Sequence, residues 1–541
     1  MTVPSLDELY LRAIRMHQRG QPTEAAALYD SVLARDPNHA GAIHLKGVLA
    51  LQAGEYDRAI KLIERSLALG PRHSLALANL GVAYRSVGRI DDAVSVLREA
   101  VALDPKSAMA HGNLSHALNR SGDIAEAVIH ARRSLAIDPG QLGLQSSALF
   151  AENYLAETDP VELADRARVV GAMFAGVGTA RVRHDNDPDP TRSLRVGFVS
   201  ADLRAHPVGR FLLGALGGLA EASSLELFAY ANSRREDEVT TALQRMVPNW
   251  RTVAGTPDEA LADQIVGDRI DVLFDLSGHS DGHRLAVFAR RPAPVAVTWL
   301  GYFATTGLAA IDYVLANRWV IPEGEERQWV ERVWRLPDSY LCFSRPADPP
   351  EVTTLPALAK GHITFASFNN FNKLSEATLR AWQPLLAAVP GARLILRSSG
   401  HYPPGIIERL HSRLAAAGFD LTRVRIDPRI SEYAAHLASY GEVDVALDTF
   451  PYNGGTTTVE ALYMGVPVLV RAGDRYVAHM GESILHDVGL SGWVAPRDAD
   501  YAAFGARLVA DLDALAALRA GLRARVLASP LFDARRFARN F

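Results

Sequence analysis

The 541 residues are enough for about three or four domains. Hydrophobic residues make up 48% and charged residues 22% of the chain, as in folded globular proteins, and the formal net charge of −4 disfavours a nucleic-acid-binding role. The single cysteine, Cys342, excludes an internal disulfide and favours a reducing compartment. The N-terminal stretch MTVPSLDELYLRAIRMHQRG lacks the apolar segment of a signal peptide, and no run reaches the ~18 apolar residues of a membrane span. We therefore expect a cytoplasmic protein that binds neither membranes nor nucleic acid.

The first quarter of the chain is a repeat. Four columns of residues recur every 34 residues, which is the length of the tetratricopeptide repeat. In such antiparallel helix pairs we expect the glycine at the turn from helix A to helix B, the alanines where helices cross closely, and the proline after helix B. The pattern predicts a tetratricopeptide α-solenoid over residues 1–140, with three complete repeats after a partial first one that lacks a clear helix A. The columns are Pro37, Pro71, Pro105 and Pro139; Gly20, Gly54, Gly88 and Gly122; Ala25, Ala59, Ala93 and Ala127; and Ala34, Ala68, Ala102 and Ala136.

Such an array can serve in two ways. Its concave surface can hold a peptide or a partner protein, or the array can be a dimerisation or packing scaffold. Asn79 and Asn113 occupy one repeat position and could hold a peptide backbone, although Leu45 stands in the equivalent place. We expect a protein or peptide in the groove, and a homodimer stays open.

A helical linker over residues 141–192 follows the repeats and ends in the polar stretch RHDNDPDPTRS, where two Asp-Pro pairs indicate a boundary. Strands rich in β-branched and aromatic residues then alternate with helical stretches. This alternation predicts a mainly parallel sheet with helices on both faces, first over 193–350 and again over 351–541. The strands of the first half are expected at 194–200, 225–232, 270–278 and 294–302, and those of the second half at 363–369, 392–398, 422–428, 443–450 and 467–473.

Two histidine-bearing loops follow strands of the first half. His206 precedes a helix and could take a proton from a hydroxyl nucleophile, or it could merely cap the helix beside Pro207. His279 and His283 have the spacing of metal ligands on a helix, but Gly278 and nearby Gly282 favour a loop that faces substrate, with no metal site.

Polar residues also follow the first strand of the second half. Lys373 lies where it can neutralise a diphosphate, and Asn369 and Asn370 can offer amide hydrogen bonds. Ser375 is expected to begin a helix. A lysine in a solvated loop is the alternative for Lys373.

The segment LDTFPYNGGTTTVEALYMGVP, residues 447–467, predicts a phosphate site at a helix N-terminus. Free backbone N–H groups and the hydroxyls of Thr456 and Thr457 can bind phosphate oxygens, and Gly455 allows close approach of the backbone. Glu460 could accept hydrogen bonds from ribose hydroxyls. The alternative is an ordinary threonine cap. The chain has no P-loop motif.

These motifs together resemble a known family. The chain is similar to the O-GlcNAc transferase and SPINDLY group of protein glycosyltransferases, of glycosyltransferase family 41 type. The resemblance is carried by the repeats, the two α/β halves, the segment just described and the motifs SADLRAHP, RPAPVAVTWLGY, TTGLAAIDY, RLPDSYLCF and FNNFNK. The resemblance covers nearly the whole chain. It implies a GT-B-type pair of Rossmann-like domains and metal-independent, inverting sugar transfer from a nucleotide donor to serine or threonine hydroxyls, with no other cofactor.

The resemblance also assigns roles to individual residues. It places His206, His279 and Tyr302 on the acceptor or sugar side and Lys373 on the donor diphosphate. On the donor side it places His436 on the nucleotide base. The other residues of the donor side are Asn369, Asn370, Gly455, Thr456, Thr457 and Glu460.

Three departures from the family are visible. Glu460 stands where the animal enzymes carry an aspartate, Gly455 where they carry a histidine, and the repeat array is much shorter. By the resemblance, the chain also stops at Phe541 inside the last helix of the family, and a C-terminus shorter than in the family is left as an open alternative.

Several points of chemistry stay open at this stage. UDP-GlcNAc is the preferred donor, with GDP-fucose and UDP-glucose as alternatives, and the acceptor proton could pass to His206, to a phosphate oxygen or to water. A repeat-based interaction protein with an idle catalytic half is the non-enzymatic alternative. A nucleotide-sugar epimerase shares the two-Rossmann architecture but has little use for a peptide-binding array.

Overall fold

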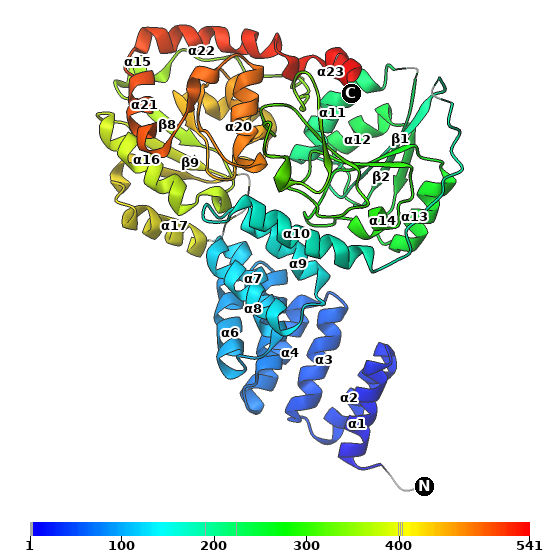
Figure 1. Cartoon of the computed structure of the whole chain (residues 1–541). Helices are drawn as coiled ribbons and strands as arrows, with labels where there is room; N and C mark the ends of the chain where they lie inside the picture. The colour runs from blue at the N-terminus through cyan, green and yellow to red at the C-terminus, as the bar shows by residue number, and fades with distance from the viewer. Residues whose placement is uncertain (1–3, 190, 223, 399, 401, 403) are drawn as a thin grey trace. The chain divides into compact units, whose positions relative to one another are not determined.

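Helices fill the first part of the chain, and helices with parallel sheets make up the rest (Figure 1). The computed structural model describes residues 4–189, 191–222, 224–398, 400, 402 and 404–541. The chain separates into two units, Met1–Ala148 and Leu149–Phe541, and each is described by itself. Among the described residues, no helix is long and apolar enough to cross a membrane.

Successive antiparallel helix pairs form the first unit, drawn from blue to cyan in Figure 1. The predicted turn glycines Gly20, Gly54, Gly88 and Gly122 have φ between +70° and +90°, a conformation that favours glycine. Each repeat proline lies two residues beyond the end of a helix B, as predicted. The helices are α1 (Leu6–Gln18), α2 (Pro22–Arg35), α3 (Ala40–Gln52), α4 (Tyr56–Leu69), α5 (Ser74–Ser86), α6 (Ile90–Leu103), α7 (Ala108–Ser121) and α8 (Ile124–Ile137).

Two expectations for the repeats were wrong. The first repeat does have a helix A, α1, which begins with a capping box between Ser5 and Glu8 rather than with the repeat columns. The alanines of the Ala25 column are buried at helix crossings, whereas those of the Ala34 column are exposed near the ends of the B helices. Helix propensity, not close packing, is therefore the physical reason for alanine in the Ala34 column.

Helices α9 (Leu142–Glu152) and α10 (Pro160–Ala175) span the predicted helical linker, and no helix or strand is assigned to the described part of residues 176–193. A seven-stranded parallel sheet follows, in the order β3-β2-β1-β4-β5-β6-β7. Its strands are β1 (Leu194–Ser200), β2 (Leu225–Ala231), β3 (Asn249–Thr252), β4 (Val272–Asp275), β5 (Val295–Thr298), β6 (Tyr313–Ala316) and β7 (Arg332–Arg335). Its helices are α11 (Pro207–Leu219), α12 (Glu238–Met246), α13 (Asp258–Gly267) and α14 (Leu285–Ala289).

A second parallel sheet has the order β10-β9-β8-β11-β12-β13. Its strands are β8 (Thr364–Ser367), β9 (Arg393–Arg397), β10 (Val424–Asp427), β11 (Val445–Leu447), β12 (Val468–Arg471) and β13 (Val494–Ala495). The helices of this half are α15 (Pro356–Lys360), α16 (Glu376–Ala388), α17 (Pro404–Ala416), α18 (Tyr433–Ala438), α19 (Thr456–Tyr463), α20 (Tyr476–Asp487), α21 (Tyr501–Leu508), α22 (Leu512–Leu527) and α23 (Ala534–Asn540).

The strand order confirms the predicted doubly wound halves. In each sheet the first strand of the half, β1 or β8, lies in the middle, and the chain returns to its other side with β4 or β11. Loops that leave the carboxyl ends of these two strands diverge at the reversal point, which is where ligands bind in such sheets. The loops that carry His206, His279, Lys373 and Thr456 start at these strands, whereas Tyr302 follows β5 and His436 follows β10.

The last helix, α23, returns from the second half to pack on α11 of the first half. Phe541 stacks on Phe274, with ring centroids 5.0 Å apart, and Phe537 stacks on Trp299 at 5.8 Å. A β-carbon on Gly218 would lie 2.0 Å from the carbonyl oxygen of Ala534. This close approach ties the C-terminal segment to the first sheet.

Candidate active site

Lys373 lies in a short 3-10 turn, Phe371–Lys373, directly after β8. Its Nζ donates a hydrogen bond to the carbonyl oxygen of Asn453 at 2.7 Å and stands 4.3 Å from the centroid of the Tyr452 ring. Burial lowers the pKa of Lys373 to about 8, and the charge of Asp448 opposes that shift. Lys373 is therefore not a solvated loop lysine, because its ammonium group is held against the loop that leads into α19.

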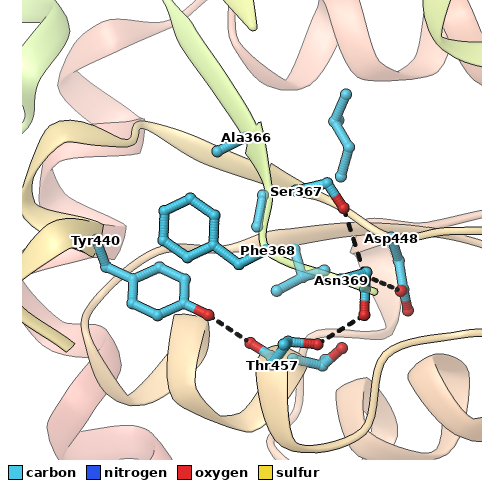
Figure 2. Close-up of a pocket in the computed structure, with 11 residues that line it drawn as sticks. Ala366, Ser367, Phe368, Asn369, Tyr440, Asp448 and Thr457 are labelled. Atoms are coloured by element: carbon cyan, nitrogen blue, oxygen red, sulfur yellow. Dashed lines mark hydrogen bonds between the residues drawn. The ribbon is translucent and has the colours of Figure 1, made fainter. Parts of the chain in front are cut away.

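Asn369 connects β8 to the start of α19, as Figure 2 shows. Its Nδ2 donates to Asp448 Oδ1 at 3.3 Å, and its Oδ1 accepts a hydrogen bond from Thr457 Oγ1 at 2.8 Å. The Tyr440 hydroxyl donates to the Thr457 carbonyl oxygen at 3.2 Å. These residues line a pocket between the ends of β8 and β11 and the first turn of α19.

Asn370 does not join this set. Its Oδ1 accepts hydrogen bonds from the Asn372 N–H at 2.9 Å and from the Tyr402 hydroxyl at 2.6 Å. The side chain thus caps the turn that carries Lys373. Ser375 begins α16 by accepting a hydrogen bond from the Thr378 N–H, as the sequence predicts.

The N-terminus of α19 has no side-chain cap. The capping residue is Gly455, so the alternative of an ordinary threonine cap is wrong. Among the described residues, the buried Thr456 Oγ1 has no hydrogen-bond partner. A hydroxyl and several N–H groups of the first helical turn are therefore available to an anion.

His436 and Glu460 form a second polar group next to this turn. His436 Nε2 lies 3.1 Å from Glu460 Oε2, and Glu460 is 4% exposed. The rings of Phe368 and Tyr440 lie 5.9 and 5.7 Å from the imidazole of His436. An aromatic wall with a buried carboxylate suits a nucleoside, whose base can stack and whose ribose can donate hydrogen bonds.

His206 is the N-cap of α11. Its Nδ1 accepts a hydrogen bond from the Val208 N–H at 3.4 Å and lies 3.6 Å from Asp202 Oδ2. Burial lowers the pKa of His206, whereas the charge of Asp202 raises it. Because Nδ1 uses its lone pair in the cap, the neutral ring carries its proton on Nε2.

The helix that His206 caps reaches the second α/β half. A β-carbon on Gly455 would lie 3.9 Å from the Phe211 ring, and the Arg210 guanidinium lies 3.8 Å from the centroid of the Tyr433 ring. Helix α11 thus brings the first half next to α18 and α19 of the second.

His279 and Tyr302 are packed side by side in the first half. The loop predicted around His279 is present, with Gly278 at φ +52°, but the imidazole itself is 2% exposed. Its Nε2 lies 2.9 Å from the Thr306 carbonyl oxygen, and burial lowers its pKa to about 3. The Tyr302 ring meets it edge-on at 5.2 Å, and Asn153 donates to the Tyr302 hydroxyl at 3.2 Å. His279 and Tyr302 therefore pack within the loop around Gly278 and support its conformation. Their direct contact with substrate stays a prediction.

The comparisons with known proteins agree with this architecture. Residues 178–344 and 352–541 match the family described as glycosyl transferase family 41, and the chain belongs to this family. Residues 10–74, 44–107 and 78–141 match the tetratricopeptide repeat. The resemblance read from the motifs is confirmed.

Individual relatives place the chain more closely. It is 35% identical over 396 residues to a Petunia hybrida protein named probable UDP-N-acetylglucosamine–peptide N-acetylglucosaminyltransferase SPINDLY; that match covers 72% of this chain and 42% of the relative. It is 22% identical over 463 residues to the UDP-N-acetylglucosamine–peptide N-acetylglucosaminyltransferase of Caenorhabditis elegans, covering 64% of this chain and 40% of that protein. The chain thus spans less than half the length of these curated relatives.

Among solved structures, a lysine-to-methionine mutant of the Thermobaculum terrenum O-GlcNAc transferase is similar along the whole chain. The TM-score is 0.77 and the identity 32%, with 100% of this chain and 97% of that chain covered. The predicted combination of a repeat solenoid and two α/β domains is confirmed.

Proposed function

We propose that this protein is an inverting, metal-independent protein O-glycosyltransferase that moves N-acetylglucosamine from UDP-GlcNAc to serine or threonine hydroxyls. One observation carries the proposal. Lys373 donates a hydrogen bond to the loop that leads into α19, and the first turn of α19 has no side-chain cap, so that its N–H groups can donate hydrogen bonds to a ligand. The names of the relatives in Petunia and Caenorhabditis support the same donor and a peptide acceptor.

Lys373 and α19 supply the charge that the reaction needs. Cleavage of the bond between the sugar and the diphosphate leaves negative charge on the phosphate, which an ammonium group and oriented N–H groups stabilise. A bound diphosphate also raises the pKa of Lys373 from about 8, so that the side chain stays protonated during transfer. In this proposal Thr456 donates to the diphosphate, Thr457 lies beside it, and Glu460 accepts from the ribose beside the His436 ring.

The acceptor proton has three routes, through His206, a phosphate oxygen or water. The cap bond at His206 Nδ1 leaves Nε2 as a donor in the neutral ring. We therefore assign His206 to holding the acceptor or the sugar, and the proton to a phosphate oxygen or to water. In this proposal His279 and Tyr302 shape the part of the site that holds the acceptor or the sugar.

The tetratricopeptide array would recruit the acceptor protein through its groove. The matched repeats and the word "peptide" in the names of the relatives support this role. We place the reaction in the cytoplasm, and dimerisation is the alternative role of the array.

Replacement of Lys373 tests the activity. Lys373→Ala is expected to reduce transfer by at least about 100-fold while the protein stays folded, since one charge-stabilising donor is typically worth that much. The measurement is mass spectrometry of lysate proteins after incubation with UDP-GlcNAc, read as a hexosamine increment on serine or threonine. Lys360→Ala is the matched control, because Lys360 is an exposed lysine of the same half whose Nζ donates to the carbonyl oxygen of Glu442. Near-normal transfer by Lys373→Ala would end the assignment.

GDP-fucose is the second candidate donor because the motifs resemble SPINDLY-type proteins at least as much, and Gly455 leaves the identity of the donor open. The ε-carbon of Met480 would lie 3.1 Å from a β-carbon placed there, so the histidine of the animal enzymes cannot be accommodated without a shift of Met480. Thermal shift with UDP and with GDP separates the two: stabilisation by UDP alone supports UDP-GlcNAc, and stabilisation by GDP alone refutes it.

A further inference from the structure

Helix α18 carries His436, yet little of this helix is buried. Of its six residues, Tyr433–Ala438, all of which the structure describes, only Leu437 is buried. The side chain of Glu432 caps the helix by accepting hydrogen bonds from its first N–H groups. A helix this short is marginal by itself, so contacts with neighbouring elements must hold it in place.

The first half of the α/β unit supplies such a contact through Arg210 of α11. Its guanidinium lies over the ring of Tyr433, 3.8 Å from the ring centroid. Within the described ranges of the chain Arg210 forms no ion pair, so its charge meets the face of this ring. Burial raises the pKa of Tyr433 and the charge of Glu460 raises it further, so the phenol is neutral and its ring attracts the cation.

The Tyr433 ring connects this contact to His436. The two rings are stacked, with planes 20° apart and centroids 6.4 Å apart, because residues three apart lie on one face of a helix. His436 Nε2 in turn lies 3.1 Å from Glu460 Oε2 on α19. A continuous series of contacts therefore runs from α11 of the first half, through α18, to the pair of residues at the candidate nucleoside site.

We propose that Arg210 is a positioning residue of the donor site: by holding the Tyr433 ring it fixes α18, and α18 presents His436 to the nucleoside. The nucleoside site is built from residues of the second half, yet it is complete only while the first half is in contact with α18. The inference rests on the proposed function for the identity of the ligand. The link between Arg210 and α18 can be measured in the ligand-free protein, whatever the reaction is.

Hydrogen exchange followed by peptide mass spectrometry tests this link. Arg210 is half-buried, so Arg210→Ala should fold. Peptides that cover α18 should exchange about fivefold faster in Arg210→Ala than in the wild type, the loss expected of one cation–π contact, while peptides that cover α19 stay unchanged. Tyr433→Leu should have the same effect on α18, whereas Tyr433→Phe keeps the ring and should not. Unchanged exchange of α18 in both Arg210→Ala and Tyr433→Leu would overturn the proposal.

Arg332→Ala is the matched control. The Arg332 guanidinium lies 4.3 Å from the centroid of the Tyr313 ring, and both residues belong to the first half. The replacement thus removes an arginine–tyrosine contact of the same kind without reaching α18, whose exchange should stay at the wild-type rate. An equal acceleration in Arg332→Ala would refute a specific role of Arg210.

Calorimetry with UDP and with uridine separates this role from direct contact with the diphosphate. A contact that acts through α18 concerns the nucleoside, so Arg210→Ala should raise the dissociation constants of both ligands by about fivefold. Introduced into Tyr433→Leu, the same replacement should cause no further loss, because the two residues act as one pair. A loss confined to UDP, or independent losses from the two replacements, would overturn the proposal.

Steady-state kinetics add the catalytic readout. The KM for UDP-GlcNAc should rise about fivefold in Arg210→Ala while kcat stays unchanged, because the contact serves binding of the nucleoside and not the reacting atoms. A lower kcat with an unchanged KM would contradict the positioning role. If α18 responds to Arg210→Ala but the wild type binds neither UDP nor uridine, the proposed function is refuted and the link between Arg210 and α18 stands.

Discussion

His479 joins the two α/β halves through a charge, and its replacement should weaken the fold in a pH-dependent way. His479 lies on α20 and is 6% exposed. Its Nε2 is 3.1 Å from Glu325 Oε1 of the first half, and its Nδ1 is 3.0 Å from Glu482 Oε2 on its own helix. Because carboxylates only accept hydrogen bonds, both ring nitrogens must carry protons, and His479 is an imidazolium.

The size of the effect follows from the pKa. Burial alone would lower the pKa of His479, but the hydrogen bonds and charges of Glu325 and Glu482 raise it to about 9. Relative to an unfolded value near 6.5, this is worth about 3 kcal/mol at roughly 1.4 kcal/mol per pH unit. Since the folded pKa is the higher one, the stabilisation is complete below about pH 6.5 and is lost as the pH rises through 9.

Urea unfolding of the wild type and of His479→Gln at pH 6 and at pH 9.5 measures this effect. All seven tryptophans lie between Trp250 and Trp493, so their fluorescence reports the α/β unit and not the repeats. We expect the difference in unfolding free energy between the two proteins to be about 3 kcal/mol larger at pH 6 than at pH 9.5.

His486→Gln is the control. His486 shares Glu482 at 3.9 Å and stacks on Trp319 at 3.6 Å, but burial lowers its pKa. Its replacement should therefore produce no loss of stability that grows toward low pH. A pH-independent difference for His479→Gln would show that the imidazole is neutral in the fold and would refute the reasoning.

Two further predictions concern the nucleoside side of the site and the packing behind it. Glu460→Gln removes the carboxylate that faces His436 and should weaken UDP binding about tenfold by calorimetry, which corresponds to one charge-assisted hydrogen bond; unchanged affinity would remove Glu460 from the donor site. Gly301→Ala should destabilise the α/β unit by more than about 3 kcal/mol in urea unfolding, because the new methyl group would lie 1.8 Å from a backbone carbonyl oxygen. Gly492→Ala, which meets no atom within 4 Å, is its control, and equal stability of the two variants would contradict the packing argument.

Much of the fold could be predicted because its signals are local or periodic. The turn glycines and prolines recur every 34 residues, and the central strands contain short apolar runs such as residues 196–199. The missed strands were β3, β6, β7 and β13, which have two to four residues each. Their identity depends on the neighbouring strand rather than on their own composition, as β7 with the sequence RVWR shows.

Some residues of the candidate site could likewise be chosen from local signals, and others could not. Lys373 and Thr456 could be chosen as candidates because each lies in the segment that follows a strand, where ligands bind in doubly wound sheets. The roles of Asn453 and Tyr452 were missed, since their contacts with Lys373 join segments about eighty residues apart in the chain. The position of the two loops after the paired strands β8 and β11 was the signal that could have brought them together.

Long-range contacts of this kind also determine whether the two halves can act as one site. Besides His479 and Glu325, Asn317 of the first half donates to Ser483 Oγ at 2.9 Å, and Gln328 donates to the Asp474 carbonyl oxygen at 2.9 Å. All of these bonds reach α20 or the residues just before it, and a β-carbon on Gly481 of the same helix would collide with Asp448. Helix α20 therefore connects the contacts between the halves to the carboxylate of Asp448. A change that moves α20 should disturb the loop between Asp448 and Gly454 even though it leaves every residue of the candidate site in place.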